Sequence, residues 1–237
     1  MFKSCLRFTA LLLSFAFLSC GEKLTEEQLL TQARESELNA EYGKAKSAYK
    51  KLLADYAASA KVQEASAKID LIEKAETLEQ ESLLTELKSY EAREDLESMQ
   101  LLYNIFLQRF PQYPQRDDIL QKLAWSYHNR KEFQRSVSTY QLLLEQLPQS
   151  SHAAQSQFMV GYIYANEIKD LDRARQAYTA FQQKYPQHDL SDDVAFELEH
   201  LGKDINDLDF LSKSSEATPS ASESNGKPAP SSRAAKQ

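Results

Sequence analysis

The sequence feature that most constrains the fold is a helix ending that occurs three times. The stretches "YNIFLQRFPQ", "YQLLLEQLPQ" and "YTAFQQKYPQ" each place a tyrosine eight residues before a proline, at Pro111, Pro148 and Pro186. These prolines are 37 and then 38 residues apart. That spacing is too long for a coiled-coil heptad, and a fixed period of this length is typical of repeat architectures. We therefore expect a protein built from repeated helical units.

The residues before Pro148 complete a two-helix pattern. Apolar residues recur at helical spacing on both sides of "NRKEF", with small residues at Ala124 and Ser136 and an aromatic residue at Tyr140. This pattern resembles the tetratricopeptide repeat, in which small residues let two helices approach closely. The next unit carries the same pattern, with one extra residue in "NEIKDLD", at Gly161, Ala174, Tyr178, Phe181 and Pro186.

Two earlier units fit the pattern less well. The unit that ends at Pro111 keeps Tyr103 and Phe106 but has Leu87 and Met99 at the small positions. The first unit has alanine, Ala57, where the others close with proline, and it otherwise consists of Ala33, Tyr42, Ala45, Tyr49 and Leu52.

The segment 61–92 adds a helix to the regular pairs. Its apolar stripe predicts either one long helix or two helices with a bend around residues 76–81. Such a stripe usually packs within the protein, and an oligomerising coiled coil is the alternative.

A further helix is expected after Pro186, starting at Ser191 and running to about residue 211. Ser191 with Asp192 and Asp193 suits a helix start. The apolar residues of this helix are expected to cover the open face of the last repeat, as a capping helix does; they are Val194, Phe196, Leu198 and Leu201. From residue 212 onwards, Ser, Ala and Pro dominate and large apolar residues are absent, which predicts a disordered tail.

The predicted fold class is all-α: an α-solenoid of three to four tetratricopeptide-like helix pairs with a C-terminal capping helix and a disordered tail. The expected segments are a lipoprotein signal peptide at 1–19, a lipid-anchored linker at 20–24, a first repeat unit at 25–57, long or paired helices plus a degenerate unit at 58–111, two repeat units and the capping helix at 112–211, and the tail at 212–237.

The N-terminal sequence "MFKSCLRFTALLLSFAFLSC" predicts a secretory signal, with positive charges at Lys3 and Arg7 before an apolar run of 11 residues. The run is shorter than the about 20 residues that span a bilayer. Its last residues, "FLSC", resemble the lipobox of bacterial lipoproteins, which implies acylation of Cys20. Gly21 follows instead of an aspartate, which in that family favours the outer membrane. An ordinary secretory signal is the alternative.

Little in the sequence points to catalysis. The chain has a net charge of −7, which argues against nucleic-acid binding, and it contains no glycine-rich phosphate loop or nucleophile motif. Its four histidines lack zinc-ligand spacing. We expect a protein that is not an enzyme and that uses no cofactor or metal.

The resemblance to tetratricopeptide repeats implies a partner-binding face built from the first helices of the units. In the two strong units this places on the face Trp125, His128, Asn129, Phe158, Tyr162 and Asn166. Trp125 is the only tryptophan and falls outside the positions that build the repeat. Burial of these residues by the capping helix or by an irregular turn is the alternative. Gln121 and Trp125 stand where chaperone-binding members of the family need Lys and Asn.

The lipobox together with the repeat endings resembles the BamD-like envelope lipoproteins. That resemblance implies partners in the envelope, either β-barrel assembly subunits or unfolded barrel substrates, and a location on the periplasmic side of the outer membrane. A Tol–Pal or cell-division coordinator of the CpoB-like type, or a cell-wall coordinator, is the alternative. CpoB-like proteins place a coiled coil before their repeats and lack the lipid anchor.

Overall fold

A computed structural model describes residues 23–203, and this range is helical with no strand. The prediction of an all-α fold of packed helix pairs is confirmed. The chain divides into two compact units, residues 1–119 and 120–237, which are described separately below. The signal segment, Cys20, residues 204–211 and the C-terminal tail all lie outside the described residues.

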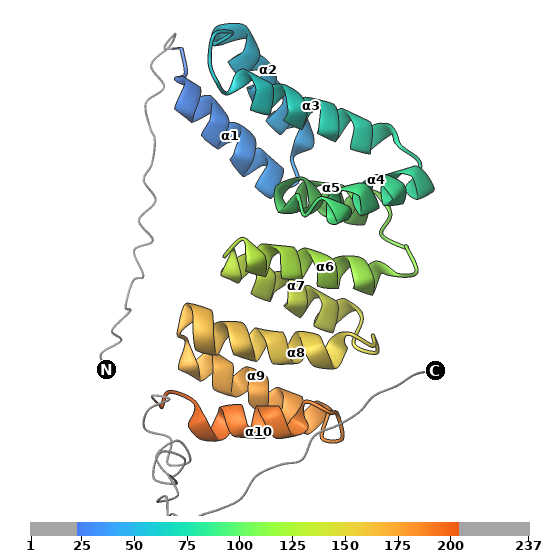
Figure 1. Cartoon of the computed structure of the whole chain (residues 1–237), viewed down its shortest axis with the longest axis vertical. Coiled ribbons are helices and arrows are strands. Elements are labelled where there is room, and N and C mark those ends of the chain that lie inside the picture. The colour runs from blue at the N-terminus through green and yellow to red at the C-terminus, as the bar shows by residue number, and fades with distance from the viewer. Residues whose placement is uncertain (1–22, 204–237) are drawn as a thin grey trace, which may run out of the picture. The chain divides into compact units, whose positions relative to one another are not determined.

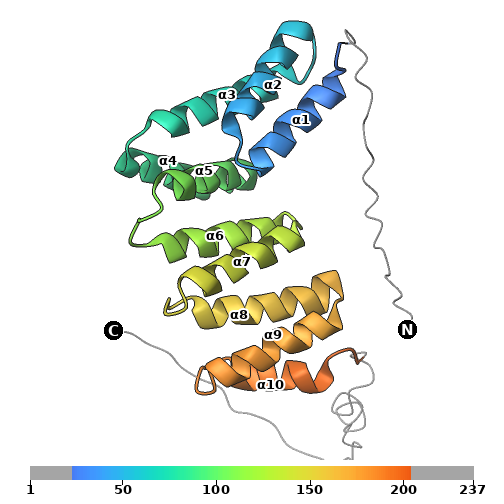
Figure 2. The ribbon, with the colours of Figure 1, turned by 180° about the vertical axis from the view of Figure 1, so that it is seen from behind.

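Between residues 23 and 115, the first unit contains five helices whose packing mostly follows the chain. α1 packs on α2 and α2 on α3, whereas α5 packs on both α3 and α4 (Figures 1 and 2). Thr25 begins α1 with a capping box, in which its hydroxyl accepts from the Gln28 N–H and the Gln28 side chain accepts from the Thr25 N–H. The helix bounds are α1 Glu26–Leu38, α2 Tyr42–Asp55, α3 Val62–Thr77, α4 Gln80–Ala92 and α5 Leu96–Arg109.

The second unit continues the same layering. α7 packs on α8, α8 on α9, and α9 on α10. α6 begins just before the boundary between the units. The helix bounds are α6 Arg116–Asn129, α7 Phe133–Gln146, α8 Ala153–Ile163, the π-helix η1 Tyr164–Ile168, α9 Leu171–Lys184 and α10 Ser191–His200.

Four helix pairs share one turn geometry. In each pair, a residue with positive φ stands two residues before the second helix. In the first pair it is Ala40, and the next residue, Glu41, donates its N–H to the Ser36 carbonyl at 2.8 Å, which is the Schellman pattern of helix ends. The equivalent residues of the other pairs are Glu94, Lys131 and Lys169. The turns define the pairs α1–α2, α4–α5, α6–α7 and α8–α9, and they leave α3 as the unpaired helix.

The tyrosine of each repeat ending lies nine residues after this turn and packs inside its pair. Tyr49, Tyr103 and Tyr178 are fully buried and Tyr140 is 3% exposed. The Tyr49 hydroxyl donates to Glu37 Oε1 at 3.0 Å, and the Tyr103 hydroxyl donates in the same way to the carboxylate of Glu91. In these two pairs the hydrogen bond offsets the desolvation of a buried hydroxyl.

Residues 61–92 form two helices, α3 and α4, which are separated at Leu78 and Glu79. The apolar stripe of α3 is buried within the chain, at Ala65, Ile69, Leu71, Ile72 and Ala75. Arg109 of α5 donates from Nη1 to the carbonyl oxygens of Ala75 and Leu78, at 2.5 and 2.7 Å, and so satisfies the C-terminal end of α3. The burial of this stripe leaves the coiled-coil alternative without an exposed apolar face on α3.

The extra residue in "NEIKDLD" is accommodated as the π-helix η1. The Asp170 N–H bonds to the Tyr164 carbonyl six residues earlier, whereas the corresponding bond spans five residues in the other pairs. The wider turn therefore absorbs one residue, and Tyr178 keeps its buried place in α9.

α10 begins at Ser191 as expected but differs in detail from the predicted capping helix. It ends at His200 and is followed by Gly202 with φ +82°, so no helix runs unbroken to residue 211. The Ser191 hydroxyl bonds to the Tyr185 carbonyl and does not cap the helix. Val194 is fully buried, whereas Phe196 is 46% exposed, so the prediction that Phe196 covers the last repeat is wrong.

Candidate functional site

The first helices of the second unit, α6 and α8, lie side by side and expose the tryptophan. Gln121 of α6 donates from Nε2 to Oε1 of Gln155 in α8 at 2.8 Å, which ties the two helices together one turn before Trp125. Trp125 is 50% exposed, which is the largest exposed fraction of any large apolar side chain between residues 120 and 203. A side chain of this size normally costs free energy when it faces water, so its position is typical of a binding anchor.

Trp125 borders a hollow of about 270 Å³ between α6 and α8. Its buried wall includes Tyr140 of α7, and burial raises the pKa of the Tyr140 phenol to about 12. The lining residues are Gln121, Lys122, Trp125, Tyr140, Gln155 and Met159. The hollow combines an apolar surface with amide groups and one lysine, which suits a protein side chain better than an ion.

Three aromatic rings continue the face beyond the hollow. The ring of His128 contacts Tyr162 edge-on at 6.3 Å, and Tyr162 stacks on Phe158 at 6.3 Å between centroids. Phe158 in turn contacts the buried ring of Tyr178 at 6.0 Å, which anchors the row to the core. His128 Nε2 also lies 3.7 Å from Oε1 of Glu167, a residue of the π-helix.

The two asparagines of the predicted face are exposed. Asn166 donates from Nδ2 to the Tyr162 carbonyl at 3.2 Å, which holds its amide against the helix. Neither Asn129 nor Asn166 lines the hollow beside Trp125. The structure thus brings together His128, Phe158 and Tyr162, places Trp125 at the hollow, and leaves both asparagines exposed outside the lining of the hollow.

Besides Gln121 and Tyr140, which the sequence analysis named in other roles, four residues of this site were missed. Gln155, Lys122 and Met159 line the hollow, and Glu167 faces His128. Lys122 and Met159 are 37 residues apart, as are Trp125 and Tyr162. The repeat phase that identified the aromatic residues could therefore have identified these two as well.

The corresponding face of the first unit is closed by ion pairs. Arg34 of α1 bonds to Glu64 of α3 at 2.6 Å. Lys68, which is 8% exposed, lies 3.6 Å from Glu37 and 2.6 Å from Glu97, so it joins α1, α3 and α5. Burial raises the pKa of Glu37, and the Lys68 ammonium opposes this shift. These charges satisfy one another, so the position equivalent to Trp125 in the first unit holds an ion-paired arginine, Arg34, in place of an aromatic side chain.

The described part of the chain shows no site for metal chemistry. No group of three or more His, Cys, Asp or Glu side chains within residues 23–203 is arranged to hold an ion. None of the helices in that range is both long and apolar enough to cross a membrane.

Helix pairs with buried small residues, Schellman turns and a first-helix face define an α-helical repeat protein. The tetratricopeptide repeat family model matches residues 118–150 and 155–188, which are the pairs α6–α7 and α8–α9. These are the two units that the sequence pattern marked as strong, and tetratricopeptide repeats bind partner proteins in general. No curated protein matches the chain.

Proposed function

We propose that the protein is a non-enzymatic scaffold lipoprotein of the bacterial envelope, which binds partner proteins through the first-helix face of α6 and α8. The observation that carries this proposal is the half-exposed Trp125 beside a hollow and an aromatic row, on two tetratricopeptide repeats. Aromatic side chains that border a pocket are the residues on which interface free energy concentrates.

The location follows from the N-terminal sequence. Acylation of Cys20 anchors the chain to the periplasmic face of the outer membrane, since several acyl chains at one site hold a protein stably. Replacing Cys20 with Ser is expected to move the protein from the membrane fraction to the soluble fraction. Retention in the membrane fraction would show that the anchor lies elsewhere.

The specific role we propose is in outer-membrane β-barrel assembly, as in BamD-like lipoproteins. The protein is purified with its anchor from envelope membranes after cross-linking, and the co-purified proteins are quantified. Barrel-assembly subunits or unfolded barrel substrates are expected among them. Recovery of Tol–Pal or division proteins in their place would favour the CpoB-like alternative.

Two matched variants test the binding face itself. Trp125→Ala removes a half-exposed apolar residue from the face, and Leu38→Ala removes one that is 52% exposed in the first unit. Trp125→Ala should reduce recovery of the partner about tenfold or more, because tryptophan anchors commonly contribute about 2 kcal/mol or more. Leu38→Ala should leave recovery unchanged. Equal recovery with both variants would show that the face is not the binding site.

A further inference from the structure

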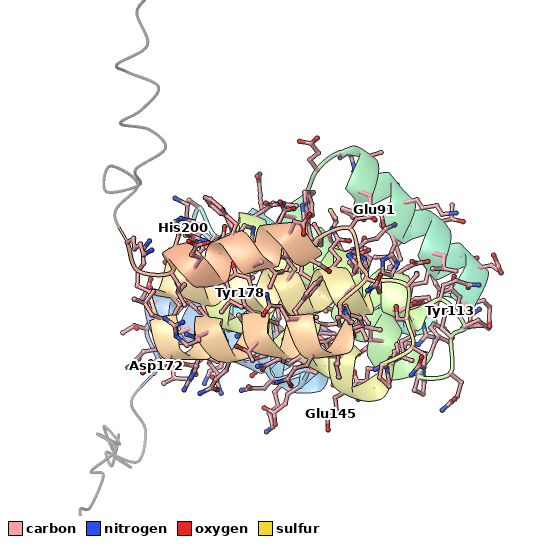
Figure 3. The ribbon with its side chains drawn as sticks, turned by 90° about the horizontal axis from the view of Figure 1, so that it is seen from below. Glu91, Tyr113, Glu145, Asp172, Tyr178 and His200 are labelled. Carbon is pink, nitrogen blue, oxygen red and sulfur yellow. The ribbon has the colours of Figure 1, made fainter. Side chains whose placement is uncertain are left out.

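α10 has two chemically different faces. Val194, Leu198 and Leu201 form one face, which packs on the core of the second unit. Phe196 and His200 lie on the opposite side of the helix, with ring centroids 4.1 Å apart and His200 Nδ1 at 2.8 Å from the Phe196 carbonyl. Figure 3 looks along the unit onto this helix, with His200 at its end and Tyr178 where α9 meets it.

Phe196 and His200 extend the first-helix face of α8. They stand 38 residues after Phe158 and Tyr162, which is also the separation of Pro148 and Pro186. Phe196 and His200 therefore occupy the same positions in α10 as Phe158 and Tyr162 occupy in α8. The helices α6, α8 and α10 follow one another in the second unit (Figure 1). α10 is thus a third first-type helix as well as a cap.

The side on which a second helix would pack is polar in α10. Glu199 stands 38 residues after Gly161, at the small position where the paired helix of the repeat approaches. Glu199 is exposed, whereas Gly161 is buried against Tyr178. A carboxylate at that position opposes close helix packing, so the exposed surface of α10 is suited to a different occupant.

The exposed surface of α10 is strongly acidic. The residues one helical turn from Phe196 are Asp192, Asp193, Glu199 and His200. The helix Ser191–His200 carries four carboxylates and no lysine or arginine. Its complementary ligand is a cationic segment that can also pack against aromatic rings.

The C-terminal segment of this same chain has that chemistry. The last eleven residues, "KPAPSSRAAKQ", contain Lys227, Arg233 and Lys236 and no acidic residue. Pro228 and Pro230 fit aromatic surfaces, as proline-rich ligands do. An extended chain spans at most about 3.3–3.6 Å per residue, so the 24 steps from Lys203 to Lys227 allow roughly 80 Å. Chain length therefore permits the contact.

We propose that residues 226–237 dock on the aromatic and acidic surface formed by Phe196, His200 and their carboxylate neighbours, next to Phe158 and Tyr162. The tail then covers one end of the partner-binding face and competes with the partner for it. The competition between tail and partner rests on the proposed function of the first-helix face. The contact between the tail and α10 can be measured without any partner.

The test uses the full chain and a fluorescent synthetic peptide of residues 226–237. The variant Lys227→Glu/Arg233→Glu/Lys236→Glu reverses the charge of residues 226–237. In this variant the tail should no longer occupy the surface of α10. The peptide should bind this variant at least about tenfold more tightly than it binds the wild-type chain, because a tethered tail competes at an effective concentration near millimolar. Binding, measured by fluorescence anisotropy, should weaken on raising salt from about 0.05 to 0.5 M.

Surface variants in the tail-reversed chain locate the contact. Phe196→Ala and Asp192→Asn/Asp193→Asn should each weaken peptide binding about tenfold, and Leu38→Ala, the matched control in the first unit, should not. The proposal would be overturned if the peptide did not bind at millimolar concentration, or if it bound the wild-type and tail-reversed chains equally tightly. It would also be overturned if the α10 variants bound the peptide as tightly as the tail-reversed chain without them. If peptide binding fails while Trp125→Ala still loses the envelope partner, the tail contact is wrong and the proposed function stands.

Discussion

Replacing Gly161 with alanine tests whether the close approach of α8 and α9 holds the binding face in place. A Cβ atom at Gly161 would lie 2.5 Å from Cδ1 and Cε1 of Tyr178. Carbon atoms in proteins do not approach this closely, and the phenol ring of Tyr178 is fully buried, so it has no free space to enter. The same ring contacts Phe158 of the aromatic row at 6.0 Å.

Two opposing effects set the size of the change. Alanine favours a helix over glycine by about 1 kcal/mol. Overpacking a well-filled core typically costs about 1–3 kcal/mol. Because the Tyr178 ring is fully buried and cannot move into solvent, we expect a cost at the upper end of that range. We expect Gly161→Ala to lower the free energy of unfolding by about 1–2 kcal/mol, which for a chain of this size is a fall in Tm of roughly 2–8 °C.

Gly43→Ala is the control, because Gly43 also lies in a helix, in the first turn of α2, but has no atom within 4 Å of the place that a Cβ atom would take. It should raise stability by up to about 1 kcal/mol. Urea unfolding followed by circular dichroism compares both variants with the wild type. A Gly161→Ala protein as stable as Gly43→Ala would refute the close approach of the two helices and, with it, the support that Tyr178 gives to Phe158.

Three further substitutions test the repeat geometry and the buried charges. Ala57→Pro should stabilise the first unit by about 0.4–1 kcal/mol in thermal unfolding, because Tyr56 before it has the backbone conformation of the residues that precede Pro111, Pro148 and Pro186. Lys131→Gly should stabilise the chain by about 1 kcal/mol, since glycine adopts positive φ without strain. Because burial raises the pKa of Glu37 above 4.5, its contribution to stability is present below that pH and is lost as pH rises through the folded pKa. The stability of the wild type relative to Glu37→Gln, measured by urea unfolding at a series of pH values, should therefore fall as the pH rises above 4.5.

The repeat architecture was predictable because the small residues and tyrosines that pack inside each helix pair recur at fixed spacing in the sequence. Tyr140 and Tyr178 are buried for the same reason that they recur: each fills the space left by small residues of its helix pair. Ala57 shows that proline is not required at the closing position, since the helix before it ends with the same backbone geometry as those before the prolines. The odd helix α3 was visible in the excess length of its segment, but the break at Leu78 follows a residue that is no recognised helix breaker.

The turns between paired helices could not be predicted from residue type. Positive φ usually selects glycine or asparagine, yet the four turns use Ala40, Glu94, Lys131 and Lys169. There the packing of the two helices overrides local preference. The exposure of Phe196 on α10 was also missed, because the spacing of this residue along the helix fits a buried apolar stripe.

The two units differ at positions that the repeat pattern leaves free. At equivalent first-helix positions, the first unit has Arg34 and Glu37, which are engaged in ion pairs, and the second has Trp125 and His128, which border the hollow and the aromatic row. Both sets preserve the same helix packing, because the small and aromatic core positions are separate from them. Helix packing therefore does not require an exposed tryptophan at position 125, and this leaves Trp125 available for the partner binding that we propose.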